Sequence, residues 1–340
     1  MKPTDFSYWL TTYLAKYLPG EVGASSNTIK SYRDTFSLFI RFCLQVQNLK
    51  PEKITLAKID KTLIASFLKW IQETRCCSVS TRNQRLAAIH AFCKFLQYEQ
   101  PELLFPLQEI LTIPFKKAGK SVISYLSIEE IKMLLEQPDR HTTQGRRDLI
   151  LLRLLYDTGA RVQEIADLKV RDIRLESPAT VKLTGKGNKT RIVPLMKPMV
   201  NLLVQYFDER NLNRQQFNEH PLFKNRSSEN LTRSGISFIL TKYFSKLKKT
   251  QLGNLPKSIS PHILRHSKAM HLLQSGVNLI YIRDLLGHVS VQTTEIYARI
   301  DNSMKRKVLE NVSSPVKSEE MPIWQNNANL LDWLKNLSNY

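Results

Sequence analysis

Apolar residues recur every three or four positions in four segments of residues 1–100. This spacing places them on one face of a helix, the face that a folded domain buries. The first segment covers residues 4–18 and ends at Pro19-Gly20, and the next three begin near Asn27, Asp60 and Ser80. We therefore predict a helical bundle over residues 1–110, with a core that contains Phe36, Phe39, Phe67, Leu86 and Phe92.

The pattern over residues 126–312 is also mainly helical. Ser127 and Glu130 have the spacing of a capping box, which marks a helix start. The apolar run Leu149–Leu155 predicts a buried helix, and Gly159 is placed to end it. Two short strands flank Gly185–Lys189 and predict a β-hairpin with Lys186 near its tip. Further helices are expected over residues 197–209, 233–248, 260–274, 278–286 and 301–312.

Two segments look like connections rather than domains. Residues 111–125 combine Pro114 and Gly119 with three lysines, so they predict a linker that either binds phosphates through its lysines or is merely flexible. Residues 313–340 form a tail with one apolar stripe that is too small to fold alone. We expect the stripe to dock on a neighbouring subunit, although it could also pack on its own domain. Its residues are Leu330, Trp333, Leu334 and Leu337.

The charge narrows the class of partner. Fifty Lys and Arg oppose 30 Asp and Glu, a formal net charge of +20. This excess favours a polyanion, with nucleic acid ahead of an anionic membrane surface. No stretch approaches the roughly 20 apolar residues of a membrane span, and the N-terminus lacks the apolar core of a signal peptide. We expect a cytoplasmic protein with no membrane partner.

The cysteines and acidic residues do not predict a metal site. Cys43, Cys76, Cys77 and Cys93 lie in apolar, helix-like patterns, so we expect buried free thiols in a reducing compartment. None has the spacing of a metal site with His, and no paired acids suggest a two-metal nuclease. No cofactor and no metal are expected.

The chemistry is concentrated near the end of the chain. His262 and Arg265 are three residues apart and share one helical face. His288 follows downstream, and Tyr297 lies on a new short helix. If these groups converge, they form a cationic pocket that contains a phenol. Such a pocket suits attack on a phosphodiester, because phosphoryl transfer needs a nucleophile, neutralised phosphate oxygens and a proton for the leaving oxygen.

These residues belong to a set of motifs that resembles the tyrosine recombinase/integrase family. The set covers most of residues 122–312. The resemblance implies an N-terminal domain that clamps DNA, a 3′-phosphotyrosyl intermediate without ATP or metal, and a C-terminal segment that passes to the next protomer. The motifs, in order, are Thr158-Gly-Ala-Arg161-Val-Gln-Glu164, Thr184-Gly-Lys186-Gly-Asn-Lys-Thr-Arg191, His262-x-x-Arg265, Gly287-His288 and Tyr297.

Chemistry and resemblance assign the same roles. Arg161 and Arg265 would grip the phosphate with planar, bidentate guanidinium groups. Lys186 would protonate the leaving 5′ oxygen, and Tyr297 would be the nucleophile. His262 would bond a phosphate oxygen or take the phenolic proton, and His288 would donate to the phosphate or position Tyr297.

Other residues are expected to support the site or to touch DNA. Glu164 lies about one turn after Arg161 and could orient the residues of the pocket without contacting the DNA itself. His266 and His271 share the helix of Arg265 and are expected to be structural or weak phosphate contacts. Gly-Lys-Gly lacks the spacing of a phosphate-binding P-loop. The candidate contacts to DNA, on exposed helix starts, the linker and the hairpin, are Lys30, Arg33, Arg82, Arg85, Lys117, Lys189 and Arg191.

Together these features predict a C-shaped clamp of two mainly helical domains on double-stranded DNA. We expect a homo-tetramer that cleaves and rejoins two duplexes at short inverted repeats, with or without a partner recombinase. We expect no arm-binding domain before the bundle, which favours a simple Xer-like or transposon-borne enzyme over a large-complex phage integrase. Two alternatives are a type IB topoisomerase and a DNA-binding regulator without catalysis. Neither the DNA site nor the use, whether integration, transposition, dimer resolution or inversion, follows from the sequence.

Overall fold

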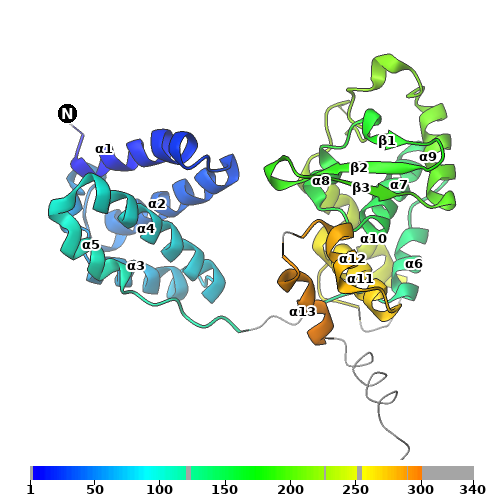
Figure 1. The fold of residues 1–340 in the computed structure, drawn as a ribbon. Helices are drawn as coiled ribbons and strands as arrows, with labels where there is room; N and C mark the ends of the chain where they lie inside the picture. The colour runs from blue at the N-terminus through cyan, green and yellow to red at the C-terminus, as the bar shows by residue number, and fades with distance from the viewer. Residues whose placement is uncertain (1–2, 120–123, 226, 251–254, 289, 301–340) are drawn as a thin grey trace, which may run out of the picture. The chain divides into compact units, whose positions relative to one another are not determined.

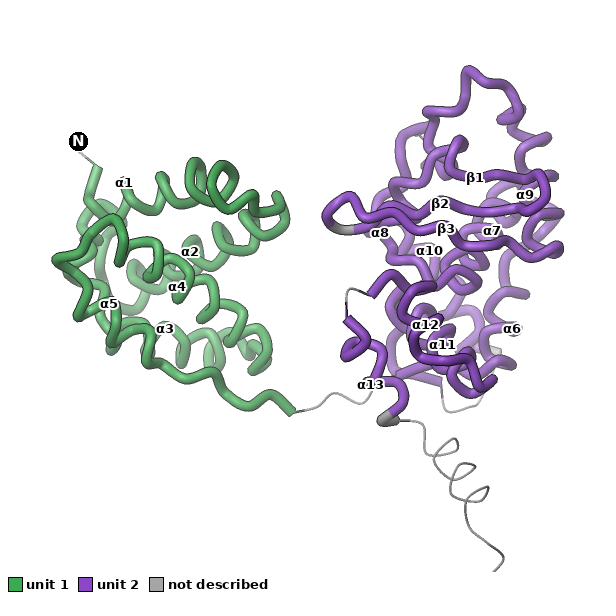
Figure 2. The backbone as a smooth tube through the Cα atoms, viewed as in Figure 1, with its two compact units in different colours: residues 1–121 green, residues 122–340 purple. Residues whose placement is uncertain are grey.

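The structure is a computed structural model that describes residues 3–119, 124–225, 227–250, 255–288 and 290–300. The chain divides into two compact units, residues 1–121 and residues 122–340 (Figure 2). Each unit has its own hydrophobic core, and the two are described separately. The predicted helix at residues 301–312 and the tail at 313–340 lie outside the described residues.

Unit 1 is a bundle of helices (Figure 1). Some helices of the bundle begin with a side-chain cap: the Asp60 carboxylate accepts from the Leu63 amide at 2.7 Å, and Ser25, two residues before the predicted start near Asn27, caps the second long helix. The elements are α1 (Asp5–Thr12), a π-helix (Tyr13–Glu21), α2 (Ser26–Val46), α3 (Lys61–Glu73), α4 (Val79–Glu99) and α5 (Leu104–Leu111), with short 3-10 turns at Pro51–Lys53, Leu56–Lys58 and Pro101–Leu103.

The core of unit 1 is built from aromatic rings on several helices. Phe36 and Phe92 pack edge to face with ring centroids 5.0 Å apart, and Phe39 and Phe67 do so at 5.4 Å. Such contacts add to the free energy gained from burying the rings. The predicted core residues are therefore confirmed, including Leu86, which has no exposed surface.

Three features of unit 1 differ from the prediction. The first helix does not end at Pro19-Gly20, because the chain widens into a π-helix that includes Pro19 and ends at Glu21. The short helix α5 was not predicted. Cys43 and Cys93 are buried as expected, but Cys76 is exposed and Cys77 half-buried, because both follow the end of α3.

The first part of the predicted linker belongs to unit 1. Ile113 is buried, and Asn83 on α4 both donates to the Lys116 carbonyl at 2.7 Å and accepts from the Lys116 amide at 3.1 Å. Arg82 donates to the Pro114 carbonyl at 3.0 Å. These hydrogen bonds fix residues 113–116 along α4 instead of leaving them as a free connection.

Unit 2 is mainly helical, with one small sheet (Figure 1). The capping box at Ser127 and Glu130 is present, and the predicted bounds of the helix over residues 197–209 are confirmed. The helices are α6 (Ile128–Glu136), α7 (Thr143–Asp157), α8 (Val162–Ala166), α9 (Lys197–Glu209), α10 (Arg233–Thr250), α11 (Pro261–Gln274), α12 (Leu279–Leu286) and α13 (Gln292–Ile300), with 3-10 turns at Val170–Asp172, Lys186–Asn188 and Gln215–Phe217.

The sheet has three antiparallel strands in the order β1-β2-β3. The hairpin of β2 (Thr180–Thr184) and β3 (Thr190–Pro194) is the predicted one, with Val181 opposite Val193 and Leu183 opposite Arg191. The strand β1 (Ile173–Arg174) was not predicted, because two residues leave no alternating pattern. The hairpin connection joins two antiparallel strands rather than a strand and a helix, which excludes a P-loop there.

The helix α7 lies in the main core of unit 2. Leu151, Leu152 and Leu154 have no exposed surface, as the apolar run predicts. A second, smaller core joins α11, α12 and α13. Its buried members are Ala269, Met270, Leu273, Ile282, Leu286 and Tyr297.

Candidate active site

A sharp turn after α7 begins the site. Gly159 has a φ of +57°, a conformation that glycine adopts without strain. A Cβ at this position would lie 2.5 Å from Leu286 Cδ2, so the turn also passes close to α12. The chain then reaches Arg161, which precedes the first residue of α8. The turn thus brings the Arg161 side chain beside the end of α12.

Arg265 joins the turn to α12. Its side chain is 4% exposed, and it donates to the Gly159 carbonyl and to the Leu286 carbonyl, both at 2.7 Å. Burial lowers the pKa of Arg265 to about 10, and the charges of Arg161 and Arg191 add to the effect. The guanidinium therefore stays charged at neutral pH, and two of its five N–H donors are used by these carbonyls.

Glu164 is the buried anion between two arginines. Its carboxylate accepts from Arg161 Nη1 at 2.9 Å, and from Arg191 Nη1 at 2.9 Å and Nη2 at 2.7 Å. It also accepts from the Arg161 amide at 2.8 Å. Burial by itself would raise the pKa of Glu164, but the hydrogen bonds and charges of Arg191 and Arg161 outweigh it, so the pKa is lowered. The carboxylate therefore orients both guanidinium groups.

The loop after α12 closes the site from the other side. Gly287 has a φ of +63°, and its carbonyl accepts from Arg161 Nη2 at 3.0 Å. His288 follows, with Nδ1 2.9 Å from Thr294 Oγ1. Burial lowers the pKa of His288 to about 4, together with the charges of Arg265, Arg161 and Arg191. His288 is thus a neutral imidazole near a cluster of arginines.

The β2–β3 hairpin starts beside Glu164. A Cβ on Gly185 would lie 2.8 Å from Glu164 Oε1, so the backbone at the start of the turn lies against the carboxylate. Arg191, on β3, donates from Nε to the Leu285 carbonyl at 2.8 Å. The side chain of Lys186 lies outside the described residues, but its backbone directly follows Gly185.

Tyr297 is buried, with 2% of its surface exposed, on the short helix α13. Its hydroxyl is 2.8 Å from Nδ1 of His266 on α11, and the two rings lie 5.6 Å apart. His266 was expected to be structural or a weak phosphate contact, not a partner of Tyr297. The spacing carried a usable signal, because His262 and His266 are four residues apart and share the face of α11 that bears the site.

His262 is the most accessible of the three histidines. Its side chain is exposed. It lies one helical turn before His266, and the centroids of the His262 and His266 rings are 6.4 Å apart. Partial burial lowers the pKa of His262, as do the charges of Arg265, Arg161 and Arg233. An anion bound among these arginines would offset their charge and favour a protonated His262.

A cavity of about 500 Å³ opens between the hairpin and the end of α12. The charge of its lining is strongly positive, with one carboxylate among the basic groups. An anion the size of a phosphate fits such a lining, because guanidinium groups bind phosphate oxygens in pairs. The lining residues are Arg161, Gly185, Lys189, Thr190, Arg191, Arg283, Asp284, Gly287 and His288.

The sequence matches known families over both units. Residues 124–304 match the phage integrase family, and residues 11–100 match the N-terminal SAM-like domain of phage integrases. The chain belongs to the phage integrase family. Two relatives, both tyrosine recombinases, match this chain over more than four fifths of its length.

The tyrosine recombinase XerD of Staphylococcus epidermidis is 34% identical over 85% of this chain and 92% of its own length. The tyrosine recombinase XerC of Roseiflexus is 32% identical over 89% of this chain and 91% of its own. This phage integrase family member is a site-specific tyrosine recombinase. These relatives support the predicted recombinase rather than the two alternatives, a type IB topoisomerase and a DNA-binding regulator without catalysis.

Solved structures share the fold of this recombinase. The XerH site-specific recombinase bound to palindromic difH substrate, in a post-cleavage complex, has a TM-score of 0.65 at 24% identity and covers 88% of this chain and 84% of its own. The Tn1549 transposon integrase, in complex with transposon right end DNA, has a TM-score of 0.65 at 15% identity and covers 90% of this chain and 99% of its own.

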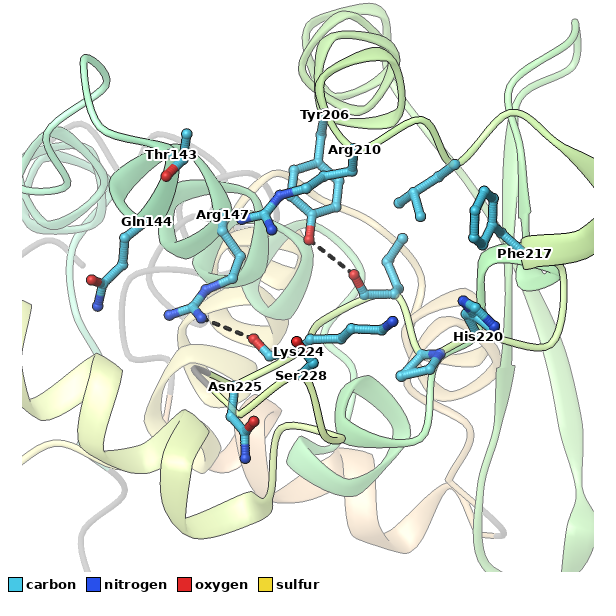
Figure 3. A pocket seen from close by; sticks show the side chains of 13 residues that line it. Thr143, Gln144, Arg147, Tyr206, Arg210, Phe217, His220, Lys224, Asn225 and Ser228 are labelled. Carbon is cyan, nitrogen blue, oxygen red and sulfur yellow. Dashed lines mark hydrogen bonds between the residues drawn. The ribbon is translucent and has the colours of Figure 1, made fainter.

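A second cavity of the recombinase, of about 390 Å³, contains none of the predicted catalytic residues (Figure 3). It lies at the start of α7, whereas Arg161 follows the end of that helix, so about 20 Å of helix separates the two. Its polar groups are largely satisfied within the fold: Arg147 donates to the Lys224 carbonyl at 2.9 Å, and the Tyr206 hydroxyl donates to the Leu222 carbonyl at 3.0 Å.

Two predicted DNA contacts of unit 1 have structural partners instead of exposed side chains. Arg82 is 6% exposed, so its predicted exposure is wrong, because it turns inward to bond the Pro114 carbonyl. Arg85 is half-buried and donates to the Ser31 carbonyl and Thr35 hydroxyl. Lys30, Arg33 and, after α5, Lys117 are exposed.

Of the two DNA contacts predicted on the hairpin, one is exposed and one is bound within the protein. Lys189 is exposed, but Arg191 binds Glu164 and the Leu285 carbonyl. Its side chain is only 12% exposed. The structure therefore shows Arg191 as part of the site's frame, where a contact to the DNA backbone was predicted.

Neither a membrane span nor a metal cluster occurs in the part of the chain that the structure describes. No helix there is long and apolar enough to cross a bilayer. No three His, Cys, Asp or Glu side chains there lie close enough to hold a metal ion.

The Glu164→Gln variant should lose both stability and cleavage. Removing one charge from a buried ion pair costs about 3 kcal/mol, because the partner charges stay buried without compensation. We expect a lower melting temperature and slower DNA cleavage, measured by calorimetry and by single-turnover assays. The matched control is Glu219→Gln, whose exposed carboxylate bridges Lys169 and Arg171. Equal losses in both variants would contradict a special role for Glu164.

Proposed function

We propose that this recombinase cleaves double-stranded DNA by attack of Tyr297 on a scissile phosphate, leaving a 3′-phosphotyrosyl link and a free 5′ hydroxyl. One observation carries the proposal. Arg161, Arg265 and His288, which are far apart in the sequence, meet where the turn after α7 contacts the end of α12, and α13 with Tyr297 packs on the neighbouring α11.

The site supplies the electrostatic part of phosphoryl transfer. Arg161 is held by Glu164 and by the Gly287 carbonyl, yet 35% of its side chain is exposed, so it can reach a phosphate without reorganising. Arg265 adds a second fixed guanidinium. Fixed donors of this kind stabilise the charge that develops on the phosphate oxygens in the transition state.

The remaining groups complete the reaction. Tyr297 Oη forms a bond to phosphorus as the bond from phosphorus to the 5′ oxygen breaks. Lys186 gives a proton to that oxygen, and His262 and His288 bond the phosphate. Because the phosphotyrosyl link conserves the bond energy, attack by a 5′ hydroxyl reverses the step and rejoins the strand.

Exposed basic residues hold the duplex. We assign Lys30, Arg33, Lys117 and Lys189 to contacts with DNA phosphates, since they are exposed. Arg82, Arg85 and Arg191 support the protein frame instead. Contacts of the first kind set affinity and its salt dependence rather than the rate of the chemical step.

A covalent-adduct assay tests the proposed cleavage. The full-length chain would first select its binding site from a random duplex library. Duplexes with that site and a nick near the scissile phosphate would then be incubated with the protein in EDTA, because the nick lets the free end diffuse away and traps the intermediate. We expect a protein–DNA band on a denaturing gel. Tight binding in a native gel without any such band would contradict the proposal.

We further propose that four protomers act on two duplexes, each passing its tail to a neighbour. The support is the apolar stripe at residues 330–337, which is too small to form a core of its own. Deleting residues 313–340 should weaken the pairing of two duplexes much more than the binding of one.

Native gels with one or two labelled duplexes measure both quantities. A second variant keeps the tail but replaces Trp333 and Leu334 by Ala. It should lose pairing as the deletion does, because it removes only the apolar stripe. Equal loss of pairing and of single-duplex binding would contradict docking of the tail on another protomer.

A further inference from the structure

We propose that His266, rather than His262, accepts the phenolic proton of Tyr297 during cleavage and returns it during rejoining. The inference rests on the proposed function and adds a residue to its chemistry. Its basis is the position of the His266 imidazole directly against the nucleophile, with Nδ1 2.8 Å from Tyr297 Oη.

The geometry separates the two histidines. His266 is half-buried and bonds the tyrosine hydroxyl, whereas His262 is exposed one turn earlier. A general base must lie within hydrogen-bond reach of the proton that it removes. Within the described residues, only His266 meets this condition with a hydrogen bond to Tyr297.

The electrostatics fit the same division. Burial lowers the pKa of His266, and the charges of His262 and Arg265 add to the effect, so the imidazole is neutral at neutral pH. Burial raises the pKa of Tyr297, although Arg265 opposes this, so the phenol keeps its proton at rest. A neutral imidazole with its proton on Nε2 accepts from the phenol through Nδ1.

The proton balance is complete. As Tyr297 Oη bonds to phosphorus, its proton moves to His266 Nδ1 and the imidazole becomes a cation. The bond from phosphorus to the 5′ oxygen breaks, and that oxygen takes a proton from a separate donor, for which Lys186 is proposed. In rejoining, the 5′ hydroxyl attacks phosphorus and gives its proton back to that donor, Tyr297 leaves as a phenolate, and His266 returns the proton to the phenolate.

The protein contains a matched control for this hydrogen bond. His271, on the same helix, pairs through Nδ1 with the Tyr156 hydroxyl at 2.8 Å. That pair does not include Tyr297. His271 is more buried than His266, since it is 6% exposed and His266 is half-buried. His271→Ala should therefore cost stability, as removal of a buried partner does, without a specific loss of adduct formation.

The test uses the full-length chain and the nicked duplex of the adduct assay. His266→Ala should bind DNA like wild type but form the adduct about 100-fold more slowly, the usual effect of losing a general base. Replacing Tyr297 with a fluorinated tyrosine, whose phenol ionises more easily, should restore about tenfold of the rate in His266→Ala but not in His262→Ala.

Three results would overturn the proposal. One is adduct formation by His266→Ala at a rate within about threefold of wild type. Another is rescue of His262→Ala by the fluorinated tyrosine and no rescue of His266→Ala. The third is full activity of His266→Gln, since an amide can hold the hydroxyl but cannot take its proton. Absence of any wild-type adduct would instead reject the proposed function itself.

Discussion

The Tyr297→Phe variant should bind its DNA site with wild-type affinity and form no covalent adduct. The phenylalanine ring fits the same small core, beside Met270, Leu273 and Leu286, so the fold of α13 should survive. Only the hydroxyl is lost, and with it the hydrogen bond to His266. Cleavage should fall below detection, since the phenol hydroxyl is the group proposed to attack the phosphate.

Native and denaturing gels on the same samples measure binding and adduct formation separately. The matched control is Tyr281→Phe, because Tyr281 lies on α12 with 71% of its surface exposed. It should form the adduct at the wild-type rate. An adduct with Tyr297→Phe, or its absence with Tyr281→Phe, would contradict the choice of nucleophile.

Arg265→Lys should lose most of the cleavage rate, by about 100-fold to 1,000-fold, which is the usual effect of removing one fixed donor to a developing oxyanion. The ammonium keeps the charge, but it cannot bond the Gly159 and Leu286 carbonyls and also present donors to a phosphate. DNA affinity should change little, because many other phosphate contacts remain.

Single-turnover cleavage and filter binding measure the two effects. The substitution also leaves a carbonyl poorly satisfied at a buried position, so we expect a loss of stability of about 1–3 kcal/mol. A control is Arg283→Lys, at the rim of the cavity, where the side chain pairs with exposed Asp284. If Arg265→Lys lost affinity and rate in equal measure, a purely electrostatic role in cleavage would be wrong.

The sequence predicted the helices and the hairpin well, because their signals are local. Asp60 caps α3, Ser127 and Glu130 form a capping box, and Gly159 has the positive φ expected of a helix stop. Such signals depend on neighbouring residues only. The π-helix around Pro19 was missed because proline usually ends a helix. Here the chain continues past Pro19 to Glu21 in the i→i+5 hydrogen-bond pattern of a π-helix.

Contacts between distant residues were harder to predict. Glu164 was expected behind Arg161, but its pairing with Arg191 joins a helix to a strand 27 positions later. Exposure of Arg82 was expected from the polar start of α4, yet the carbonyl that it bonds lies 32 positions away. No local pattern contains such partners.

The same limit applies to the proposed nucleophile. The motifs predicted Tyr297 for this role, but the partner of its hydroxyl depends on how α13 packs against α11. His266 and His271 are both histidines on one helix, each paired with a tyrosine, and the sequence does not distinguish which pair bears the chemistry. The fold adds one distinction: among the described residues, His266 is the histidine that hydrogen-bonds Tyr297, the predicted nucleophile.

The most direct measurement is to identify the atom that DNA is attached to. Trypsin cuts after Arg283 and Arg299, and the peptide between them, residues 284–299, contains Tyr297 as its single tyrosine. Mass spectrometry of the digested adduct should find this peptide carrying a 3′-phosphate nucleotide, and polynucleotide kinase should label the released 5′ hydroxyl. A nucleotide on another peptide, or a link through the 5′ phosphate, would contradict the account.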